Sequence, residues 1–181
     1  MKEQLERDGL VYLPKFFNED FCNFLHNANI LSELKDGDCP VVGGEFYKGY
    51  TLPHGEALLI QTTHMLQHHL GPLYPAYSYA RVYLPGNTLG RHVDRGCCEI
   101  GMSLTLTRQE PWAFYITDKH GEDHVIEMDV GDAVVYKAQE CEHWRPDPAP
   151  CESGHFFMFF VYKDGDLAHL KYDEREVDYG F

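Results

Sequence analysis

The sequence lacks any apolar run that approaches the roughly 20 residues a membrane-spanning helix needs. Its first eight residues are charged where a secretory signal would be apolar. No two cysteines have the CxxC spacing typical of zinc fingers and thioredoxin-like sites, although six cysteines are present. We therefore expect a cytoplasmic protein with free thiols and no membrane partner.

Basic residues are also scarce, because 15 Lys and Arg stand against 29 Asp and Glu and give a net charge of −14. Such a charge repels a phosphate backbone, so we expect no nucleic-acid partner. Hydrophobic residues, in contrast, make up 44% of the 181 residues. This content is enough to bury a sizeable core, and we expect a single domain that spans residues 1–181.

The amino-terminal part, about residues 1–75, is expected to be helical. Asn18 precedes an acidic turn and an apolar series at helical spacing, which predicts a capped amphipathic helix. A second helix is expected at about residues 56–70, with Gly71 as its C-terminal stop. Residues 35–53 are rich in Gly and Asp, and we expect a long loop there that could cover a site as a lid.

The β-rich core is expected at about residues 76–165, where short apolar or aromatic runs alternate with turn residues. Such a pattern is typical of a sandwich or barrel, so we expect a mainly β (α+β) fold with the amino-terminal helices packed on one sheet. The predicted strands are residues 77–84, 100–107, 112–117, 125–128, 133–136 and 156–162.

Three histidines are followed two residues later by an acid, a spacing that can supply two ligands of a ferrous centre. Such a centre takes two imidazoles and one carboxylate on one face of an octahedron, which leaves positions for co-substrate and oxygen. Chance alone gives about two such pairs at this composition. The pairs are His54 with Glu56, His92 with Asp94, and His120 with Glu122.

Context selects one of these pairs. The first stands at a helix start, where its glutamate is explained as a first-turn acid. The third flanks a glycine in the polar tip of a hairpin, where solvent exposure is expected. Only His92 and Asp94 follow a Pro85-Gly86 turn after a strand, with a further β segment soon after. We therefore expect this pair at the end of a core strand.

A third ligand must come from a later strand that passes the same rim. A Gly131-Asp132 turn and an apolar strand lead to His143 after a short polar link. An isolated histidine is more often a surface or capping residue. The argument for His143 therefore depends on the order of the motifs around it.

Over residues 79–172 the sequence resembles the prolyl-hydroxylase-like branch of the iron(II)- and 2-oxoglutarate-dependent dioxygenases. The matching elements are Tyr83-Leu84-Pro85-Gly86, His92-Val93-Asp94, Gly131-Asp132, and His143 within a His-Trp-Arg sequence. The resemblance implies a double-stranded β-helix, or jelly roll, in agreement with the strand pattern. It also implies that His92, Asp94 and His143 are the catalytic metal ligands.

The resemblance implies Fe(II) as the metal, 2-oxoglutarate and O2 as co-substrates, and ascorbate as a further candidate cofactor. The reaction would hydroxylate an amino-acid residue such as proline, or a small metabolite, and release succinate and CO2. Asp94 favours hydroxylation, because related halogenases lack this carboxylate. The partner is then a small-molecule or protein substrate, and the acidic surface would suit a basic protein.

The family binds the distal carboxylate of 2-oxoglutarate with an Arg or Lys about ten residues beyond the distal histidine. This chain has neither in the corresponding residues 152–155, and alignment of the final strand places His155 at that position. Arg145 is the alternative, since it lies two residues beyond His143 and could share its strand face. We favour Arg145, because it stays charged at any physiological pH.

Hydroxyl groups are expected to assist that cation. Tyr83 is the first candidate, with Thr105 or Ser103 on the following strand behind it. Arg95 is a candidate substrate contact. It is one of four arginines near the motif, some of which we expect to be solvated: Arg81, Arg91, Arg95 and Arg108.

Two alternatives belong to other classes of protein. A non-redox, cupin-like metal-binding module would use His92, Asp94 and His143 without a cation for 2-oxoglutarate, and the missing Arg or Lys near Ser153 supports it. An inactive interaction domain would bind no stoichiometric metal.

Overall fold

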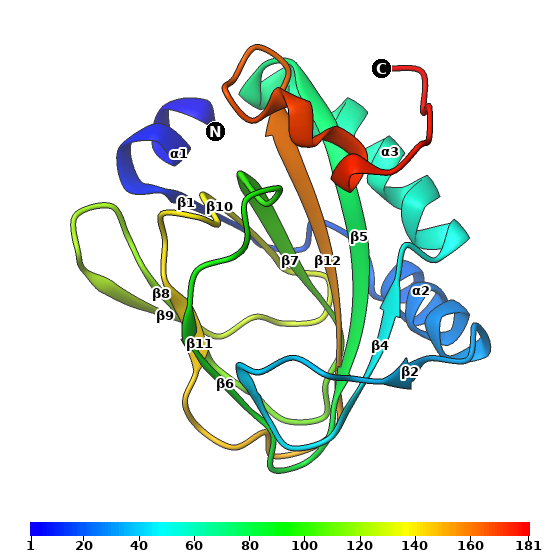
Figure 1. Ribbon diagram of the computed structural model, residues 1–181. Helices are drawn as coiled ribbons and strands as arrows, with labels where there is room; N and C mark the ends of the chain where they lie inside the picture. Colours follow the sequence, from blue (N-terminus) through cyan, green and yellow to red (C-terminus); the bar gives the residue numbers. More distant parts are fainter.

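A computed structural model describes residues 1–181 as two antiparallel β-sheets with helices against one of them (Figure 1). The seven-stranded sheet has the order β1-β10-β7-β12-β5-β4-β2, and the five-stranded sheet has the order β3-β6-β11-β8-β9. The expected mainly β fold with helices on one sheet is therefore confirmed. None of the helices combines the length and the apolar character that crossing a membrane requires.

The larger sheet consists of β1 (Leu10–Leu13), β2 (Lys35–Asp36), β4 (Phe46–Tyr50), β5 (Leu73–Tyr83), β7 (Ile100–Thr107), β10 (Ala133–Tyr136) and β12 (Ser153–Tyr162). The smaller sheet consists of β3 (Val42–Gly43), β6 (Thr88–His92), β8 (Phe114–Thr117), β9 (Asp123–Ile126) and β11 (His143–Arg145). The helices are α1 (Lys2–Asp8), α2 (Glu19–Leu31) and α3 (Pro53–Leu70), and a 3₁₀ segment η1 (Ala168–Glu174) follows the last strand.

Strand alternation gives the larger sheet two different faces. On β12, Phe156, Met158 and Phe160 belong to the main apolar core, into which α2 and α3 pack. The intervening side chains of the same strand, among them His155 and Phe157, lie on the opposite face because the strand period is two. That opposite face turns toward the smaller sheet, and the cavity described below lies between the two sheets.

The two predicted helices are present with bounds close to those expected. Asn18 caps α2, since its side chain accepts a hydrogen bond from the backbone N–H of Phe21. Helix α3 begins at Pro53, three residues earlier than expected, because proline suits the first turn of a helix. The backbone N–H of Gly71 closes α3 on the carbonyl of Gln67.

The loop expected at residues 35–53 is instead partly β-structure. Strand β4 pairs with β5 from Phe46 opposite Tyr83 to Tyr50 opposite Tyr79. The glycines and aspartates of this segment predicted a loop, whereas Phe46, Tyr47 and Tyr50 favour a strand, and pairing with β5 decides between the two. Strand β1 was not predicted either, although its sequence Leu-Val-Tyr-Leu favours a strand, whereas β11 agrees with the expectation that His143 lies on a later strand.

Candidate active site

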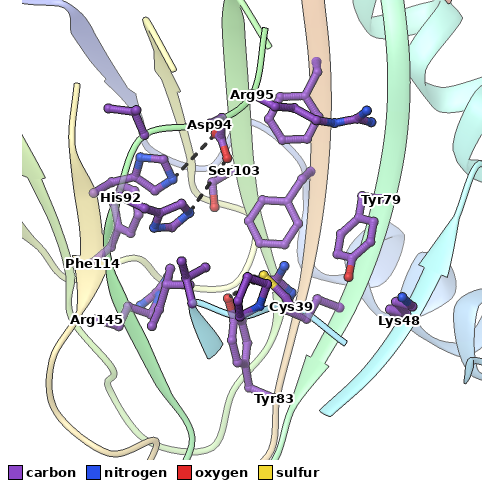
Figure 2. A pocket seen from close by; sticks show the side chains of 18 of the residues that line it. Cys39, Lys48, Tyr79, Tyr83, His92, Asp94, Arg95, Ser103, Phe114 and Arg145 are labelled. Atoms are coloured by element: carbon purple, nitrogen blue, oxygen red, sulfur yellow. Dashed lines mark hydrogen bonds and ion pairs between the residues drawn. The ribbon is translucent and has the colours of Figure 1, made fainter. Parts of the chain in front are cut away.

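The pairing of β6 with β11 places His92 directly opposite His143. Asp94 follows β6, and its backbone N–H is held by the carbonyl of Ala138 at 2.8 Å. One ligand atom from each of His92, Asp94 and His143 lies within 4.8 Å of the other two. Figure 2 shows the side chains of His92 and Asp94 turned toward each other, and the ligand atom of His143 joins them within the same 4.8 Å. The structure thus brings together the three residues that the motifs selected.

Hydrogen bonds to the backbone determine which imidazole nitrogens are free. His92 Nδ1 contacts the carbonyl of Gly90 at 2.8 Å, and His143 Nδ1 contacts the carbonyl of Cys141 at 3.1 Å. Because a carbonyl only accepts, Nδ1 carries the proton and Nε2 keeps its lone pair toward Asp94. Burial lowers the pKa of His143, which favours the neutral ring that a metal needs.

The separations within this group leave room for a metal ion. His92 Nε2 is 3.8 Å from one oxygen of Asp94, and His143 Nε2 is 3.6 Å from the other. Both distances are too long for a hydrogen bond. The Tyr136 hydroxyl donates to Asp94 at 3.3 Å and helps to orient the carboxylate. Two neutral imidazoles and one carboxylate are the donor set that suits ferrous iron with open positions.

These residues lie at one end of a cavity of about 540 Å³, and Arg145 and Tyr83 line its other end (Figure 2). Arg145 is buried, donates to the carbonyl of Trp112, and lies 4.6 Å from the centre of the Trp112 ring. Burial lowers its pKa to about 10, so the guanidinium is still charged at neutral pH. Arg145 and Tyr83, which were predicted to contact the co-substrate, therefore line the same cavity as the three candidate metal ligands.

Thr105 and His155 lie next to this end of the cavity but do not line it. They are neighbours across β7 and β12, and Arg81 on β5 is the next neighbour of His155. Each of the three has a buried polar atom without a partner: Thr105 Oγ1, His155 Nδ1 and Arg81 Nε. Burial, together with the charges of Arg145 and Arg81, lowers the pKa of His155, so the ring is neutral.

Arg81 is the residue that sequence reasoning missed. It lines the cavity and donates to the Tyr83 hydroxyl at 2.7 Å. Neither Arg81 nor Arg145 forms an ion pair with a carboxylate, since their hydrogen bonds go to a hydroxyl and to a carbonyl. The signal was present, because Arg81 stands two residues before Tyr83 on one strand and therefore shares its face.

The two rejected pairs, His54 with Glu56 and His120 with Glu122, contribute no ligand to this site. Glu56 is buried, and its carboxylate accepts hydrogen bonds from Ser78, Arg175 and Tyr179. Glu56 is therefore more than a first-turn acid, because its hydrogen bonds join α3 to β5 and to the carboxyl-terminal segment. His120 lies at an exposed hairpin tip beside Gly121, as expected.

Comparison with known proteins finds no matching family model and no matching curated protein sequence. Solved structures are similar. A prolyl-4-hydroxylase from Pseudomonas putida has a TM-score of 0.73 and 19% identity over 88% of this chain and 96% of its own. An oxidoreductase of the 2OG-Fe(II) oxygenase family from Burkholderia pseudomallei has a TM-score of 0.74 and 16% identity over 88% of each chain.

A prolyl hydroxylase from Trichoplax adhaerens, in complex with a peptide fragment of the hypoxia inducible factor oxygen degradation domain, has a TM-score of 0.70 and 10% identity. The similarity covers 89% of this chain and 81% of that one. At such identities the likeness concerns the fold, and it agrees with the resemblance carried by the motifs. The chain therefore has the double-stranded β-helix fold of the prolyl-hydroxylase-like 2-oxoglutarate oxygenases.

Proposed function

We propose that the protein is an iron(II)- and 2-oxoglutarate-dependent oxygenase that hydroxylates its substrate and releases succinate and CO2. One observation carries this proposal. Two imidazoles and a carboxylate converge at one end of a cavity whose other end holds two guanidinium groups without an ion-pair partner. Such a charge pattern suits a dianion with one end on a metal and the other on an arginine.

In this proposal His92, Asp94 and His143 hold the iron. Iron(II) with bound 2-oxoglutarate supplies the activation of oxygen. The protein holds the metal ligands in place, keeps the imidazole of His143 neutral through its burial, and lines the cavity with apolar and aromatic side chains beside the polar ones.

Arg145 is the proposed partner of the distal carboxylate. It follows His143 on β11 by two residues, a separation of about 7 Å that suits a five-carbon diacid. Tyr83 assists, because its oxygen already accepts a hydrogen bond from Arg81 and its own proton is free for a ligand. Neutral His155 can contribute a hydrogen bond but no charge, and Thr105 Oγ1 lies beside it.

The proposed substrate is an amino-acid residue or a small metabolite. The peptide complex of the Trichoplax protein supports the first option. A cupin-like module without redox chemistry would need no cation opposite the metal ligands. The guanidinium groups of Arg145 and Arg81 therefore favour the oxygenase over that alternative.

Anaerobic titration with iron(II) and then 2-oxoglutarate tests the proposal through the visible charge-transfer band of the iron chelate. We expect the band in the unaltered protein and no band in His92→Ala. In Arg145→Ala the dissociation constant for 2-oxoglutarate should rise about 10- to 100-fold, because a charged hydrogen bond is lost. Arg7→Gln, an exposed arginine on α1, is the matched control and should behave like the unaltered protein.

Two results would change the assignment. An unchanged dissociation constant for 2-oxoglutarate in Arg145→Ala, together with loss of the band in His155→Ala, would move the carboxylate contact to His155. A metal-loaded protein that gives no band with 2-oxoglutarate would overturn the oxygenase and favour the cupin-like module.

A further inference from the structure

The part of the cavity next to Asp94 and away from Arg145 has an aromatic wall and a cation, Arg95. The rings of Tyr77 and Phe159 stack with their centroids 4.7 Å apart, and Tyr50 lies 5.2 Å from Tyr77. Arg95 lines the same part of the cavity, and its guanidinium lies 4.5 Å above the ring of Tyr77. Figure 2 shows Arg95 on the side away from Arg145. This wall suits an apolar body, and the cation suits an anionic group attached to it.

Arg95 already binds a carboxylate of the protein itself. Its Nη2 donates to Asp173 Oδ2 at 2.7 Å, and the Tyr50 hydroxyl donates to the same oxygen. The Asp173 side chain is only 11% exposed. The cavity therefore borders a formed carboxylate site with two donors, both of which line the cavity.

Lys48, another cation that lines the cavity, is not comparable. Lys48 pairs with Asp38, whose side chain is 85% exposed. Water and salt screen such a pair, and it contributes little to holding a ligand in one orientation. Lys48 is also a flexible point charge, whereas the planar guanidinium of Arg95 matches a carboxylate.

The segment that carries Asp173 has a strained backbone. Tyr172, Asp173 and Glu174 have φ values of 58°, 54° and 56°, in the left-handed region that non-glycine residues rarely adopt. The segment is held on one side by Arg175, which donates to Glu56 at 2.8 Å, and by the buried ring of Tyr172. A strained backbone persists only when its contacts impose it. Release of Asp173 from Arg95 would let this segment relax, so a competing carboxylate displaces Asp173 more easily than it would displace a carboxylate on an unstrained segment.

We propose that the primary substrate is a small carboxylic acid with an apolar or aromatic body. Its carboxylate replaces Asp173 on Arg95 and Tyr50, and its body lies along the wall of Tyr77 and Phe159. Arg95 directly follows Asp94, so a substrate anchored there lies beside the metal ligands. The hydroxylation of this substrate depends on the proposed function, whereas its binding does not.

Binding of phenylacetate and of its neutral analogue phenylacetamide tests the proposal. Both are titrated calorimetrically into protein loaded with nickel(II), which prevents turnover, and saturated with 2-oxoglutarate. We expect phenylacetate to bind at least about 10-fold more tightly than the amide, because only the acid forms the charged contact. Arg95→Gln should remove this preference. Asp173→Asn should tighten phenylacetate about 3- to 10-fold, since it removes the competing carboxylate.

Arg91→Gln is the matched control. Arg91 is an exposed arginine that pairs with Glu142 and Asp123 and does not line the cavity. It should keep the preference for the acid. Melting curves establish that each variant is folded, and Asp173→Ser provides a second test should Asp173→Asn be unfolded.

Equal affinity for the acid and the amide would overturn the proposal, as would an unchanged preference in Arg95→Gln or weaker phenylacetate binding in Asp173→Asn. Failure of the proposed function is distinguishable from these results. An Arg95-dependent preference for phenylacetate, in a protein without the iron chelate band, would leave the carboxylate site standing and remove the oxygenase.

Discussion

The contact between His124 and Asp118 differs in kind from the contacts of Asp94 with His92 and His143. At the β8–β9 hairpin, His124 Nε2 lies 2.8 Å from Asp118, a direct hydrogen bond that helps to lower the pKa of Asp118 to about 2. At the candidate metal site the corresponding distances are 3.8 Å and 3.6 Å. The first contact is complete without a ligand. The second leaves a lone pair and a carboxylate facing a space that a cation can fill.

Asp132 carries a prediction at the scale of one residue. Burial by itself would raise its pKa, but hydrogen bonds from Tyr12 and from the backbone N–H groups of Lys15 and Asp129 outweigh it and lower the pKa. We expect Asp132→Asn to lower the free energy of unfolding by about 1–3 kcal/mol at pH 7. Urea denaturation measures this difference.

The pH dependence of the same variant follows from the lowered pKa. A carboxyl group with a folded pKa below its unfolded value of about 3.9 stabilises the protein above that pH. The stabilisation is lost as the pH falls through the folded pKa. The difference between the unaltered protein and Asp132→Asn should therefore shrink below about pH 4. A difference that stays constant down to pH 2 would contradict this account.

Among the elements, strand β5 decides which side chains reach the cavity. Tyr77, Tyr79, Arg81 and Tyr83 alternate with residues that face the helices, so one strand contributes both to the aromatic wall and to the co-substrate end. A shift of one residue in the pairing of β5 with β12 would turn these side chains into the apolar core. The register of this pair is therefore as important to the site as the identity of its residues.

The turn before β10 gives a prediction at the scale of an element. Gly131 has a φ of +88°, and a Cβ there would lie 2.1 Å from the backbone oxygen of Phe17. We expect Gly131→Ala to lower the free energy of unfolding by about 3 kcal/mol, from the left-handed conformation and the clash together. Chemical denaturation measures it.

Gly121 is the control for this prediction, because it has a φ of +84° and nothing within 4 Å of a Cβ. Gly121→Ala should cost only about 1–2 kcal/mol, from the conformation alone. Equal costs for the two variants would show that the approach of Phe17 has no effect on stability.

At the scale of the whole molecule, the site exists because the two sheets face each other. The smaller sheet carries His92, His143 and Arg145, and the larger sheet carries Tyr83 and Arg81. Neither sheet alone contains both the metal ligands and the hydroxyl that faces them. Ligands that join the two sheets should therefore stabilise the folded protein as a whole.

Metal binding should raise the melting temperature. A ligand at 100 times its dissociation constant adds about 2.7 kcal/mol, which is roughly 5–10 °C for a chain of this size. We expect such a shift with nickel(II), measured by differential scanning calorimetry, and its loss in His143→Ala. His120→Ala changes an exposed histidine and should keep the shift. The same shift in both variants would place the metal elsewhere.

Much of the fold could be predicted from local patterns. The cap at Asn18, the stop at Gly71 and the strand at residues 100–107 each depend on neighbours in the chain, and the structure contains all three. The strands that were missed are short, and pairing with a partner strand decides their conformation. Strand β4, for example, is formed by its pairing with β5, a contact that local preference does not encode.

The sequence by itself determined most of the strands of the β-rich part, the two longer helices and the one His-x-Asp pair at a strand end, because these depend on the spacing and chemistry of adjacent residues. The tertiary structure alone decided that His143 lies opposite His92 and that Arg81 lines the cavity. It also decided that Arg95 donates a hydrogen bond to Asp173. The physical reason is that these contacts join residues from separate strands and segments. Their geometry is fixed by sheet register and packing, which no local stretch of sequence contains.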